Sequence, residues 1–339
     1  MKVAREMVNK GRSGVGKTEL DFLDWIRPQL SQVEEFIRQS LQDDHPLTTE
    51  IAQHLQDGGG KRLRPALVLL GGAVVDESFP SDLIPVSAAV EIIHMATLVH
   101  DDTIDKASLR RGVPTVNHKW NSEIAILIGD FLFARGFSLL AEYGGNAVVR
   151  IMADVVFRMS SGEIEQLSQA YDLNQNEESY LTRIDKKTAY FIGESCRLGA
   201  VVSGSSAEIE HALRRFGFNI GMSYQIIDDL LDFGHDPQEI GKPIGNDLRS
   251  GVLTLPVLYA LEHAEERERA AALIRSQPQS DEEIEEIRQI VRNSGGLEYA
   301  EQVAQKYTDE AMKCLAMLPP GKAHDTLMAM ANFLLERTY

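Results

Sequence analysis

The segment 86-VSAAVEIIHMATLVHDD-102 repeats apolar residues every three or four positions over more than four turns and then ends in acidic residues. This period is that of a helix with one buried face. The ranges 146–170, 207–233, 251–275, 281–293 and 297–317 have the same period. Alternating strand patterns bounded by hairpin turns are absent from the sequence. The chain is therefore predicted to be helical throughout.

Short breaks separate the predicted helices. They are rich in Gly, Pro, Asn, Asp and Ser and lie at 57-DGGG-60, 143-YGG-145, 172-DLNQNEES-179, 202-VSGSS-206, 234-GHDPQEIGKPIGN-246, 276-SQPQSD-281 and 318-LPPGKA-323. Long amphipathic helices joined by short turns predict an all-α bundle. No linker or change in composition divides the chain, so we expect a flexible N-terminal arm over residues 1–18 and a single domain over residues 19–339.

Residues 11–18, GRSGVGKT, match the phosphate-loop pattern G-x-x-x-x-G-K-[ST]. That loop requires a buried strand before it and a parallel sheet behind it. Here the preceding residues are charged and the remainder of the chain is helical in pattern. We therefore interpret this segment as part of the arm and not as a nucleotide site.

Composition excludes several classes of protein. The chain of 339 residues carries 34 Lys+Arg against 51 Asp+Glu, a formal net charge of −17. Such an acidic chain is not expected to bind nucleic acid, whose binding site would be a basic stripe. Two cysteines, Cys196 and Cys314, cannot form a disulfide framework and favour a reducing cytoplasm. No signal peptide and no uninterrupted apolar run of about 20 residues is visible, so we do not expect an integral membrane protein.

The first candidate site is 100-HDDTIDKASLRRG-112, in which Asp101, Asp102 and Asp105 occupy positions i, i+1 and i+4. Asp101 and Asp105 lie one helical turn apart, where like charges repel and destabilise a helix. Divalent cations would remove that repulsion. Oxygen ligands with no cysteine nearby suit Mg²⁺, which also recruits phosphates. A solvated acidic helix end would explain one such cluster equally well.

A second segment, 224-YQIIDDLLDFGHD-236, repeats the spacing with Asp228, Asp229 and Asp232. It too lies in an otherwise apolar helix. Duplication of D-D-x-x-D in two apolar helices is improbable by chance and favours a metal site. We expect the two clusters to face one another across a cavity in the bundle.

Basic residues accompany both clusters. Lys61, Arg62 and Arg64 follow the glycines of 58-GGGKRLRP-65, and glycines allow a backbone to approach an oxyanion closely. Further basic residues near glycine turns or aspartate helices are Arg110, Arg111, Lys187 and Lys242. A chain of charge −17 that binds a polyanion must do so locally, through metals and such groups.

Together these motifs resemble those of the trans-prenyltransferases, or polyprenyl diphosphate synthases. The resemblance runs from about residue 25 to the C-terminus and rests on six motifs in the family's order. They are GGGKRLRP, the first aspartate cluster with RRG after it, Gly162-Glu163-x-x-Gln166, the KTA of residues 187–189, YQIIDDLLD and GKPIGNDL. It implies an isoprenoid-synthase helical bundle around a central cavity, and an enzyme that joins isopentenyl diphosphate to an allylic diphosphate.

The resemblance also implies residue roles. Three Mg²⁺ ions would bind with substrate on Asp101, Asp105 and Asp228, helped as ligands or through hydrogen bonds by Asp102, Asp229 and Asp232. The allylic diphosphate would bind Arg110, Lys187 and Lys242, and isopentenyl diphosphate would bind Lys61, Arg64, His94 and Arg111. Thr188 and Gln225 would direct oxygen dipoles at the developing carbocation. Water must be kept from that cation, and the apolar helices would exclude it.

One residue, His94, has a second interpretation, and one segment, residues 246–256, departs from the family's pattern. His94 lies two turns before Asp101 on the same face, and from the residues alone it fits a buried core histidine as well as a ligand. Near 246-NDLRSGVLTLP-256 the family often has a lysine at or beside the position of Val252, whereas Arg249 is the only base here. We therefore expect this loop to contact a phosphate less strongly than the loop of those family members does.

Product length is predicted from the residues before the first aspartate. Family members that stop early place a bulky aromatic residue about one turn upstream, whereas this chain has Ala96, with Ile93 further up. One turn rises about 5.4 Å, close to one isoprene unit, which predicts a product of roughly C30 to C40. Such a chain suits a quinone side tail, built on farnesyl or geranylgeranyl diphosphate as primer.

Other functions share some of these motifs. A terpene cyclase or head-to-head coupling enzyme would lack the second basic pocket of Lys61, Arg64 and Arg111. A non-catalytic subunit of a two-component synthase would be expected to lose the aspartate clusters, and both are present. A catalytic subunit that needs a small partner stays open beside the homodimer that the resemblance implies. We expect a cytoplasmic enzyme, with peripheral membrane contact for product release left open.

The substitution Ala96→Tyr should shorten the product, because a ring one turn before Asp101 would close the path of the growing chain. Chromatography of the prenyl products of both enzymes measures this. Unchanged product length would refute the role of Ala96.

Overall fold

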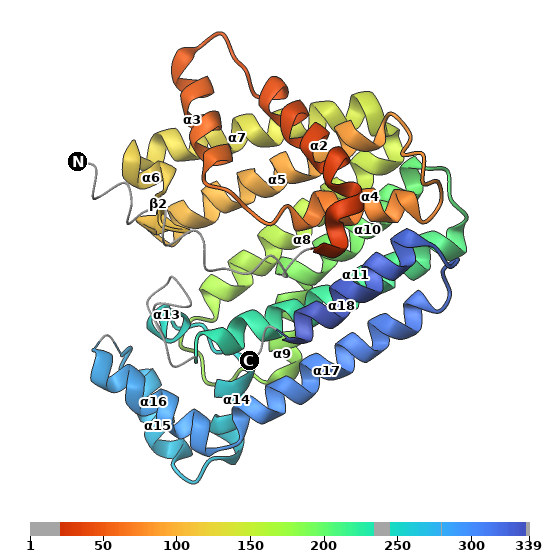
Figure 1. Cartoon of the computed structure of the whole chain (residues 1–339). Helices are drawn as coiled ribbons and strands as arrows, with labels where there is room; N and C mark the ends of the chain where they lie inside the picture. The colour runs from red at the N-terminus through yellow and green to blue at the C-terminus, as the bar shows by residue number, and fades with distance from the viewer. Residues whose placement is uncertain (1–20, 234–244, 279, 337–339) are drawn as a thin grey trace, which may run out of the picture.

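The structure is a computed structural model that describes residues 21–233, 245–278 and 280–336, and nearly all of its elements are helices (Figure 1). The predicted arm of residues 1–18 lies outside the described residues. Along the chain the elements are η1 (Asp21–Ile26), α2 (Arg27–Ser40), α3 (Pro46–Asp57), α4 (Leu63–Ala73), α5 (Leu83–Ile104), β1 (Leu109–Arg110), β2 (Val113–Pro114), α6 (Val116–Lys119), α7 (Ser122–Leu139), η2 (Leu140–Gly144), α8 (Gly145–Ser168), α9 (Glu177–Ile184), η3 (Asp185–Ala189), α10 (Tyr190–Val202), α11 (Ala207–Leu231), α13 (Asn246–Arg249), α14 (Leu255–His263), α15 (Arg267–Arg275), α16 (Asp281–Asn293), α17 (Gly296–Leu315) and α18 (Lys322–Glu336).

The predicted all-α class is confirmed. Helices α5, α8, α11, α16 and α17 lie where the apolar period predicts them, within a few residues at each end. The prediction of one helix over 251–275 is wrong, because α14 ends at His263 and α15 begins at Arg267. Ala264, which caps α14, has an extended backbone with ψ 146°. The antiparallel pair β1–β2 was not predicted, since two residues a strand carry no alternation to recognise.

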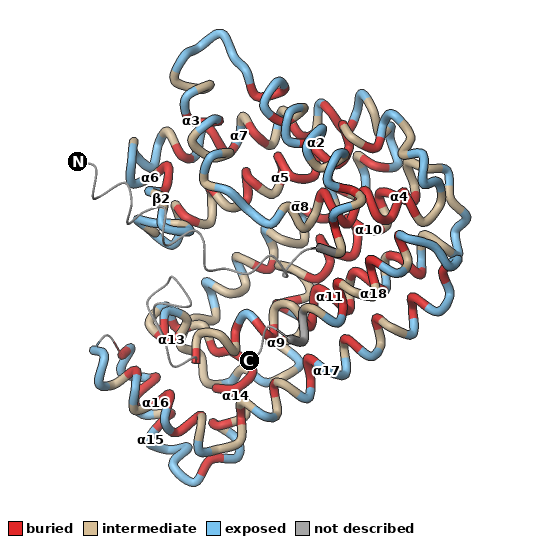
Figure 2. The backbone as a smooth tube through the Cα atoms, viewed as in Figure 1, coloured by how far each residue is buried: buried red, intermediate tan, exposed pale blue. Residues whose placement is uncertain are grey.

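Helix α5 runs through the core. Fifteen of its residues are buried, and it packs against α2, α4 and α7. Helix α10 packs between α4 and α11, and α11 packs on α17. Figure 2 shows the buried residues concentrated along these central helices. The C-terminal ends of α5 and α11, which carry the two aspartate clusters, lie on the same side of the molecule, at the left of Figure 1.

Helices α4 and α10 approach one another backbone to backbone. A Cβ atom on Gly71 would overlap the carbonyl oxygen of Cys196, and one on Gly199 would overlap that of Val68. Helix α4 begins just after the three glycines of residues 58–60, and α10 begins just after η3, which carries Lys187 and Thr188. The crossing therefore fixes two candidate substrate-binding segments relative to each other.

Two helical stretches are long and apolar enough by composition to cross a membrane, Leu83–Ile104 and Ser122–Ser168. The apolar window of the first is 78% buried inside the protein, as expected of a core helix. That of the second, which spans α7 and α8, is only 39% buried. The second stretch therefore presents apolar surface that the chain itself does not cover.

The substitution Gly199→Ala should destabilise the fold by about 1–3 kcal/mol, because the new methyl group overlaps the α4 backbone. Thermal unfolding monitored by circular dichroism measures the loss. Gly321→Ala is the control, since its Cβ would meet only Glu77 Oε1, at 3.5 Å. An unfolding temperature for Gly199→Ala at or above that of the control would contradict the close crossing.

Candidate active site

Both aspartate clusters lie at the C-terminal ends of helices. Asp101 and Asp102 are in the last turn of α5 and Asp105 is its C-cap residue, while Asp228 and Asp229 end α11 and Asp232 caps it. The C-terminal end of a helix carries partial negative charge, so carboxylates there are unfavourable unless cations offset them. The fold thus places six acidic groups where positive charge is needed.

Three of the six carboxylates are bonded within the protein. Arg110 Nε donates to both oxygens of Asp102 at 2.9 and 2.8 Å. Asp229 accepts from the Tyr180 hydroxyl at 2.7 Å and from Gln225 Nε2 at 2.8 Å. Asp232 accepts from the backbone N–H groups of residues 245–247 at 3.0–3.3 Å. These groups are held in place by their partners, which makes them supports for the neighbouring carboxylates.

Asp101, Asp105 and Asp228 have no side-chain hydrogen bond or ion pair among the described residues. Burial raises the pKa of Asp101 to about 6, with Lys187 acting in the opposite direction. Burial, together with Glu163, also raises the pKa of Asp105. Asp101 is half-buried, whereas Asp105 and Asp228 are exposed. Carboxylates that lack a bonded cation match the oxygen donors that Mg²⁺ prefers.

Protein atoms alone do not complete a metal cage. Within residues 21–233, 245–278 and 280–336, no group of three or more His, Cys, Asp or Glu side chains is arranged to hold an ion. Mg²⁺ usually keeps several waters and binds through one or two carboxylates plus substrate phosphates. The donors present therefore fit an ion that arrives with a phosphorylated ligand.

The π-helical turn η3 brings the two clusters together. Lys187 Nζ pairs with Glu163 Oε2 at 2.5 Å, and its charge acts on Asp101 and Asp105. The next residue, Thr188, donates its hydroxyl to Gln225 Oε1 at 2.7 Å. Because Gln225 also bonds Asp229, Thr188 is linked to the second aspartate cluster through Gln225, while the charge of Lys187 acts on the first.

A second basic region surrounds His94. Arg64 Nη1 lies 3.0 Å from His94 Nε2, and the Arg64 guanidinium lies 4.6 Å from the centroid of the Phe191 ring. Burial, followed by the charges of Arg64, Arg111 and other arginines, lowers the pKa of His94 well below 6.5. The ring is therefore neutral, so Nε2 accepts from Arg64 and Nδ1 carries the proton.

Two buried donors in this region have no partner within the described residues: His94 Nδ1 and Arg64 Nε. Unsatisfied buried donors are uncommon in proteins and indicate a missing acceptor. A pocket opens beside them, lined by Gly58, Gly59, Arg62, His94 and Arg111 together with apolar residues of α5. The region is suited to an anionic ligand with a small apolar part.

The remaining predicted residues are placed as follows. Arg111 donates to the carbonyl oxygen of Gly59, and its Nη1 would lie 2.7 Å from a Cβ on Gly60, so a side chain there would displace it. Lys61 Nζ lies 6.0 Å from the centroid of the Phe333 ring on α18. Arg249 pairs with Asp281. Lys242 lies outside the described residues.

The two predicted chain-length residues are fully buried in α5. Ile93 packs on α7, where a Cβ on Gly136 would lie 2.6 Å from its Cγ1 atom. Neither Ala96 nor Ile93 lines the pocket beside His94. Their role in product length stays a prediction.

Sequence reasoning assigned no role to several residues of the site. Arg62 bonds Glu91 at 3.0 Å and Glu34 at 3.3 Å, so it braces the glycine segment. Glu163 pairs with Lys187, and its place in the G-E-x-x-Q motif was a usable signal. Tyr180 bonds Asp229 from α9, 49 residues away along the chain, and no local pattern marks it.

Comparisons with known proteins agree with this geometry. Residues 45–291 match the model of the Polyprenyl synthetase family. The chain is 39% identical to heptaprenyl diphosphate synthase component 2 of Bacillus subtilis, over 93% of the chain and 90% of that protein. It is 32% identical to the all-trans-nonaprenyl-diphosphate synthase (geranyl-diphosphate specific) of Rhodobacter capsulatus, over 94% of the chain and 97% of that protein.

Solved structures are similar over the same extent. The heptaprenyl diphosphate synthase of Staphylococcus aureus is 34% identical with a TM-score of 0.87, covering 95% of this chain and 100% of that one. A polyprenyl synthase of Caulobacter crescentus CB15, complexed with calcium and isoprenyl diphosphate, is 33% identical with a TM-score of 0.88. The match covers 94% of this chain and 97% of that one.

A neutral buried His94 has a consequence for stability. Its folded-state pKa is lowered, so the unfolded chain takes up a proton below about pH 6.5 that the folded chain does not. Stability that is complete above pH 6.5 is then lost as the pH falls, by at most about 1.4 kcal/mol per pH unit. His94→Gln keeps an acceptor for Arg64 and should remove this loss.

Urea unfolding of the wild type and His94→Gln at pH 7.5 and 5.5 measures the difference. The control variant is His211→Gln, which removes an exposed histidine. Parallel pH dependence of wild type and His94→Gln would contradict a neutral buried ring.

Proposed function

Because the chain belongs to the polyprenyl synthetase family, we propose that it condenses isopentenyl diphosphate with an allylic diphosphate and makes a medium- or long-chain all-trans polyprenyl diphosphate. It is an enzyme of the prenyltransferase class. The observation that carries the proposal is the convergence of two acidic helix ends on one turn that bears Lys187 and Thr188. The catalytic unit is proposed to be the single domain of residues 19–339.

Asp101, Asp105 and Asp228 are the proposed ligands of Mg²⁺, since these carboxylates lack protein partners among the described residues. Bound Mg²⁺, three ions in the complete site, would stabilise the charge that develops on the departing pyrophosphate. Asp102, Asp229 and Asp232 position the ligands through the hydrogen bonds described above. Lys187, Arg110 and Lys242 are proposed to hold the allylic diphosphate.

Isopentenyl diphosphate is assigned to the region of Arg64, His94 and Arg111, with Lys61 at its edge. The unpartnered donors His94 Nδ1 and Arg64 Nε support an anionic ligand there. The ligand's double bond attacks the allylic cation, and a proton then leaves for the released pyrophosphate. No side chain of the described site is assigned the role of base.

Gln225 has one orientation in this site. Its amide nitrogen donates to Asp229, so its carbonyl oxygen accepts the Thr188 hydroxyl. The lone pairs of Thr188 remain available to stabilise positive charge on the substrate. We therefore assign the dipole nearest the cation to Thr188 and a supporting role to Gln225.

The proposed product has roughly 30 to 40 carbons by the one-unit-per-turn estimate. Ala96 leaves no ring in the path of the chain. The relative named as a heptaprenyl diphosphate synthase component, with seven five-carbon units, accords with this length, and a quinone side chain is the proposed destination. Farnesyl or geranylgeranyl diphosphate is the proposed primer.

A homodimer is proposed from the uncovered apolar face of α7 and α8. Phe157 and Ile164 of α8 are 72% and 68% exposed, and Leu127 of α7 is 63% exposed. Exposed apolar patches of this kind mark protein interfaces. Two relatives carry the name "component 2", so the same face would serve a small partner subunit in a heteromer. The enzyme is proposed to be cytoplasmic, with peripheral membrane contact at product release.

The deciding experiment incubates the purified chain with Mg²⁺, labelled isopentenyl diphosphate and farnesyl or geranylgeranyl diphosphate, and sizes the prenyl products. We expect polyprenyl products, and Asp101→Asn should lower their rate by about 10²–10³-fold, as for loss of a charge-stabilising group. Asp309→Asn, an exposed acid on α17, is the matched control. An Asp101→Asn rate equal to that of the control would contradict the metal role.

A further inference from the structure

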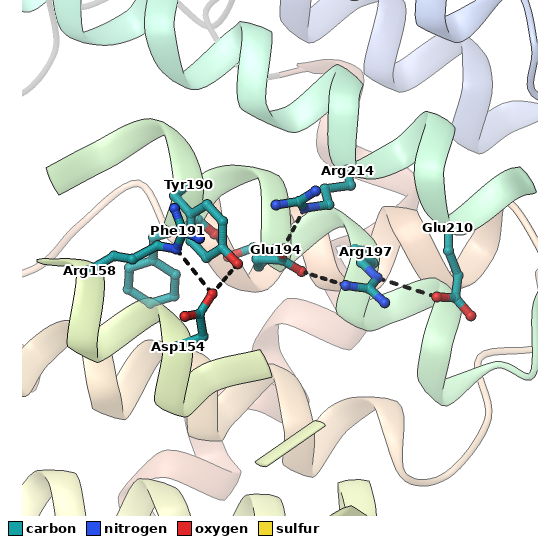
Figure 3. Close-up of polar contacts among 9 residues, drawn as sticks. Asp154, Arg158, Tyr190, Phe191, Glu194, Arg197, Glu210 and Arg214 are labelled. Carbon is teal, nitrogen blue, oxygen red and sulfur yellow. Dashed lines mark hydrogen bonds and ion pairs between the residues drawn. The ribbon is translucent and has the colours of Figure 1, made fainter. Parts of the chain in front are cut away.

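A polar network joins α8, α10 and α11 (Figure 3). Tyr190, the first residue of α10, is 9% exposed, and its hydroxyl donates to Asp154 Oδ2. Arg158 Nε donates to the same oxygen at 3.0 Å. The guanidinium carbons of Arg158 and Arg214 lie 4.3 and 5.2 Å from the centroid of the Tyr190 ring.

The network is anchored in the core by Glu194, which is 1% exposed. Its Oε1 accepts from Arg214 Nε at 2.5 Å, and its Oε2 lies 3.4 Å from Arg197 Nη1. Arg197 Nε in turn reaches Glu210 at 3.3 Å (Figure 3). Because a buried carboxylate without a partner is strongly destabilising, this pairing fixes the position of Arg214.

The same two arginines act on both ends of η3. Asp185 opens the π turn and Tyr190 follows its last residue. Burial raises the pKa of Asp185, while Arg158 and Arg214 act in the opposite direction. Burial and the bond to Asp154 raise the pKa of Tyr190 to about 12, so its hydroxyl stays a donor. Arg158, Asp185, Tyr190 and Arg214 line one cavity, so both ends of the turn lie near the same pair of cations.

The register of η3 decides where its side chains point. A π turn is one residue longer than the α-helical turn it replaces, and such turns are rare and found mostly at functional sites. If the turn relaxed to α-helix by one residue, Lys187 and Thr188 would rotate by about 100° around the axis. The contacts of Lys187 with Glu163 and of Thr188 with Gln225 would then be lost.

We propose that Tyr190 is a positioning residue, which holds η3 in its π register through Asp154, Arg158 and Arg214 and so aims Lys187 and Thr188 at the allylic diphosphate. The inference rests on the proposed function for the identity of the ligand. Tyr190 itself does not contact the reacting atoms in this assignment.

The variant Tyr190→Phe keeps the ring and removes the hydroxyl, and with it the bond to Asp154. We expect kcat and kcat/KM for the allylic substrate to fall by about tenfold, the loss typical of a hydrogen bond to a charged group, while KM for isopentenyl diphosphate changes less than about twofold. Tyr299→Phe is the matched control, because the Tyr299 hydroxyl donates to Glu177 at 2.6 Å and burial and that bond raise its pKa to about 12 as well.

Two further measurements separate positioning from a general loss of structure. In a double-mutant cycle on kcat/KM, the loss in the double variant Tyr190→Phe/Thr188→Val should be smaller than the product of the two separate losses. The losses caused by Tyr190→Phe and Arg111→Lys should multiply. Hydrogen exchange of the amides of residues 185–190 should be about tenfold faster in Tyr190→Phe than in the wild type and unchanged in Tyr299→Phe.

The proposal fails if Tyr190→Phe has no larger effect than Tyr299→Phe, if it raises KM for both substrates together, or if its effect multiplies with Thr188→Val. Unchanged exchange at residues 185–190 would also overturn it. If the wild-type enzyme makes no prenyl product, the proposed function is wrong, and the exchange measurement still decides whether Tyr190 holds the turn.

Discussion

Carboxylates at the C-terminal end of a helix are repelled by the partial negative charge of that end. The rest of the site follows from this electrostatic constraint. Two helices, α5 and α11, end this way, in a chain of net charge −17. The protein limits the cost by bonding one part of each cluster to Arg110, Tyr180 or backbone N–H groups. Asp101, Asp105 and Asp228 are left without a bonded cation among the described residues, which is why these three are proposed as the Mg²⁺ ligands.

The turn η3 packs against neighbouring helices and also carries residues of the candidate site. Its basic residues reach α8, where Lys186 bonds Glu165 at 2.6 Å, and α8 approaches closely because Gly162 has no side chain: a Cβ there would lie 2.9 Å from Lys186 Cβ. Its hydroxyl reaches α11 through Gln225. A single irregular turn thus bonds to two helices, α8 and α11. Irregular backbone of this kind persists only where its surroundings over-determine it.

Much of this organisation follows from the sequence. The apolar period of α5 predicts a buried helix, and the repeated D-D-x-x-D spacing predicts two acidic helix ends. Spacing alone treats the three aspartates of each cluster alike, so only the family resemblance separated the expected ligands from their helpers. The partners Tyr180 and Arg110 could not be predicted as such, because they come from other elements. The π turn was equally hidden, since the extra residue in 185–189 leaves the composition of a helix unchanged. The break between α14 and α15 depends on the backbone at Ala264, which has no turn-forming residue to mark it.

The contact between α4 and α10 has a mechanical consequence. Arg64 lies in the first turn of α4 and leans on Phe191 in the first turn of α10, and the two helices touch at Gly71 and Gly199 with no side chain between them. The proposed isopentenyl diphosphate region at Arg64 and the proposed allylic diphosphate region at η3 would therefore belong to one rigid block, and the spacing between them would stay constant from one cycle of elongation to the next. In a processive synthesis the geometry of bond formation would be the same in every cycle. The growing hydrocarbon chain, and not the two sites, would then have to move.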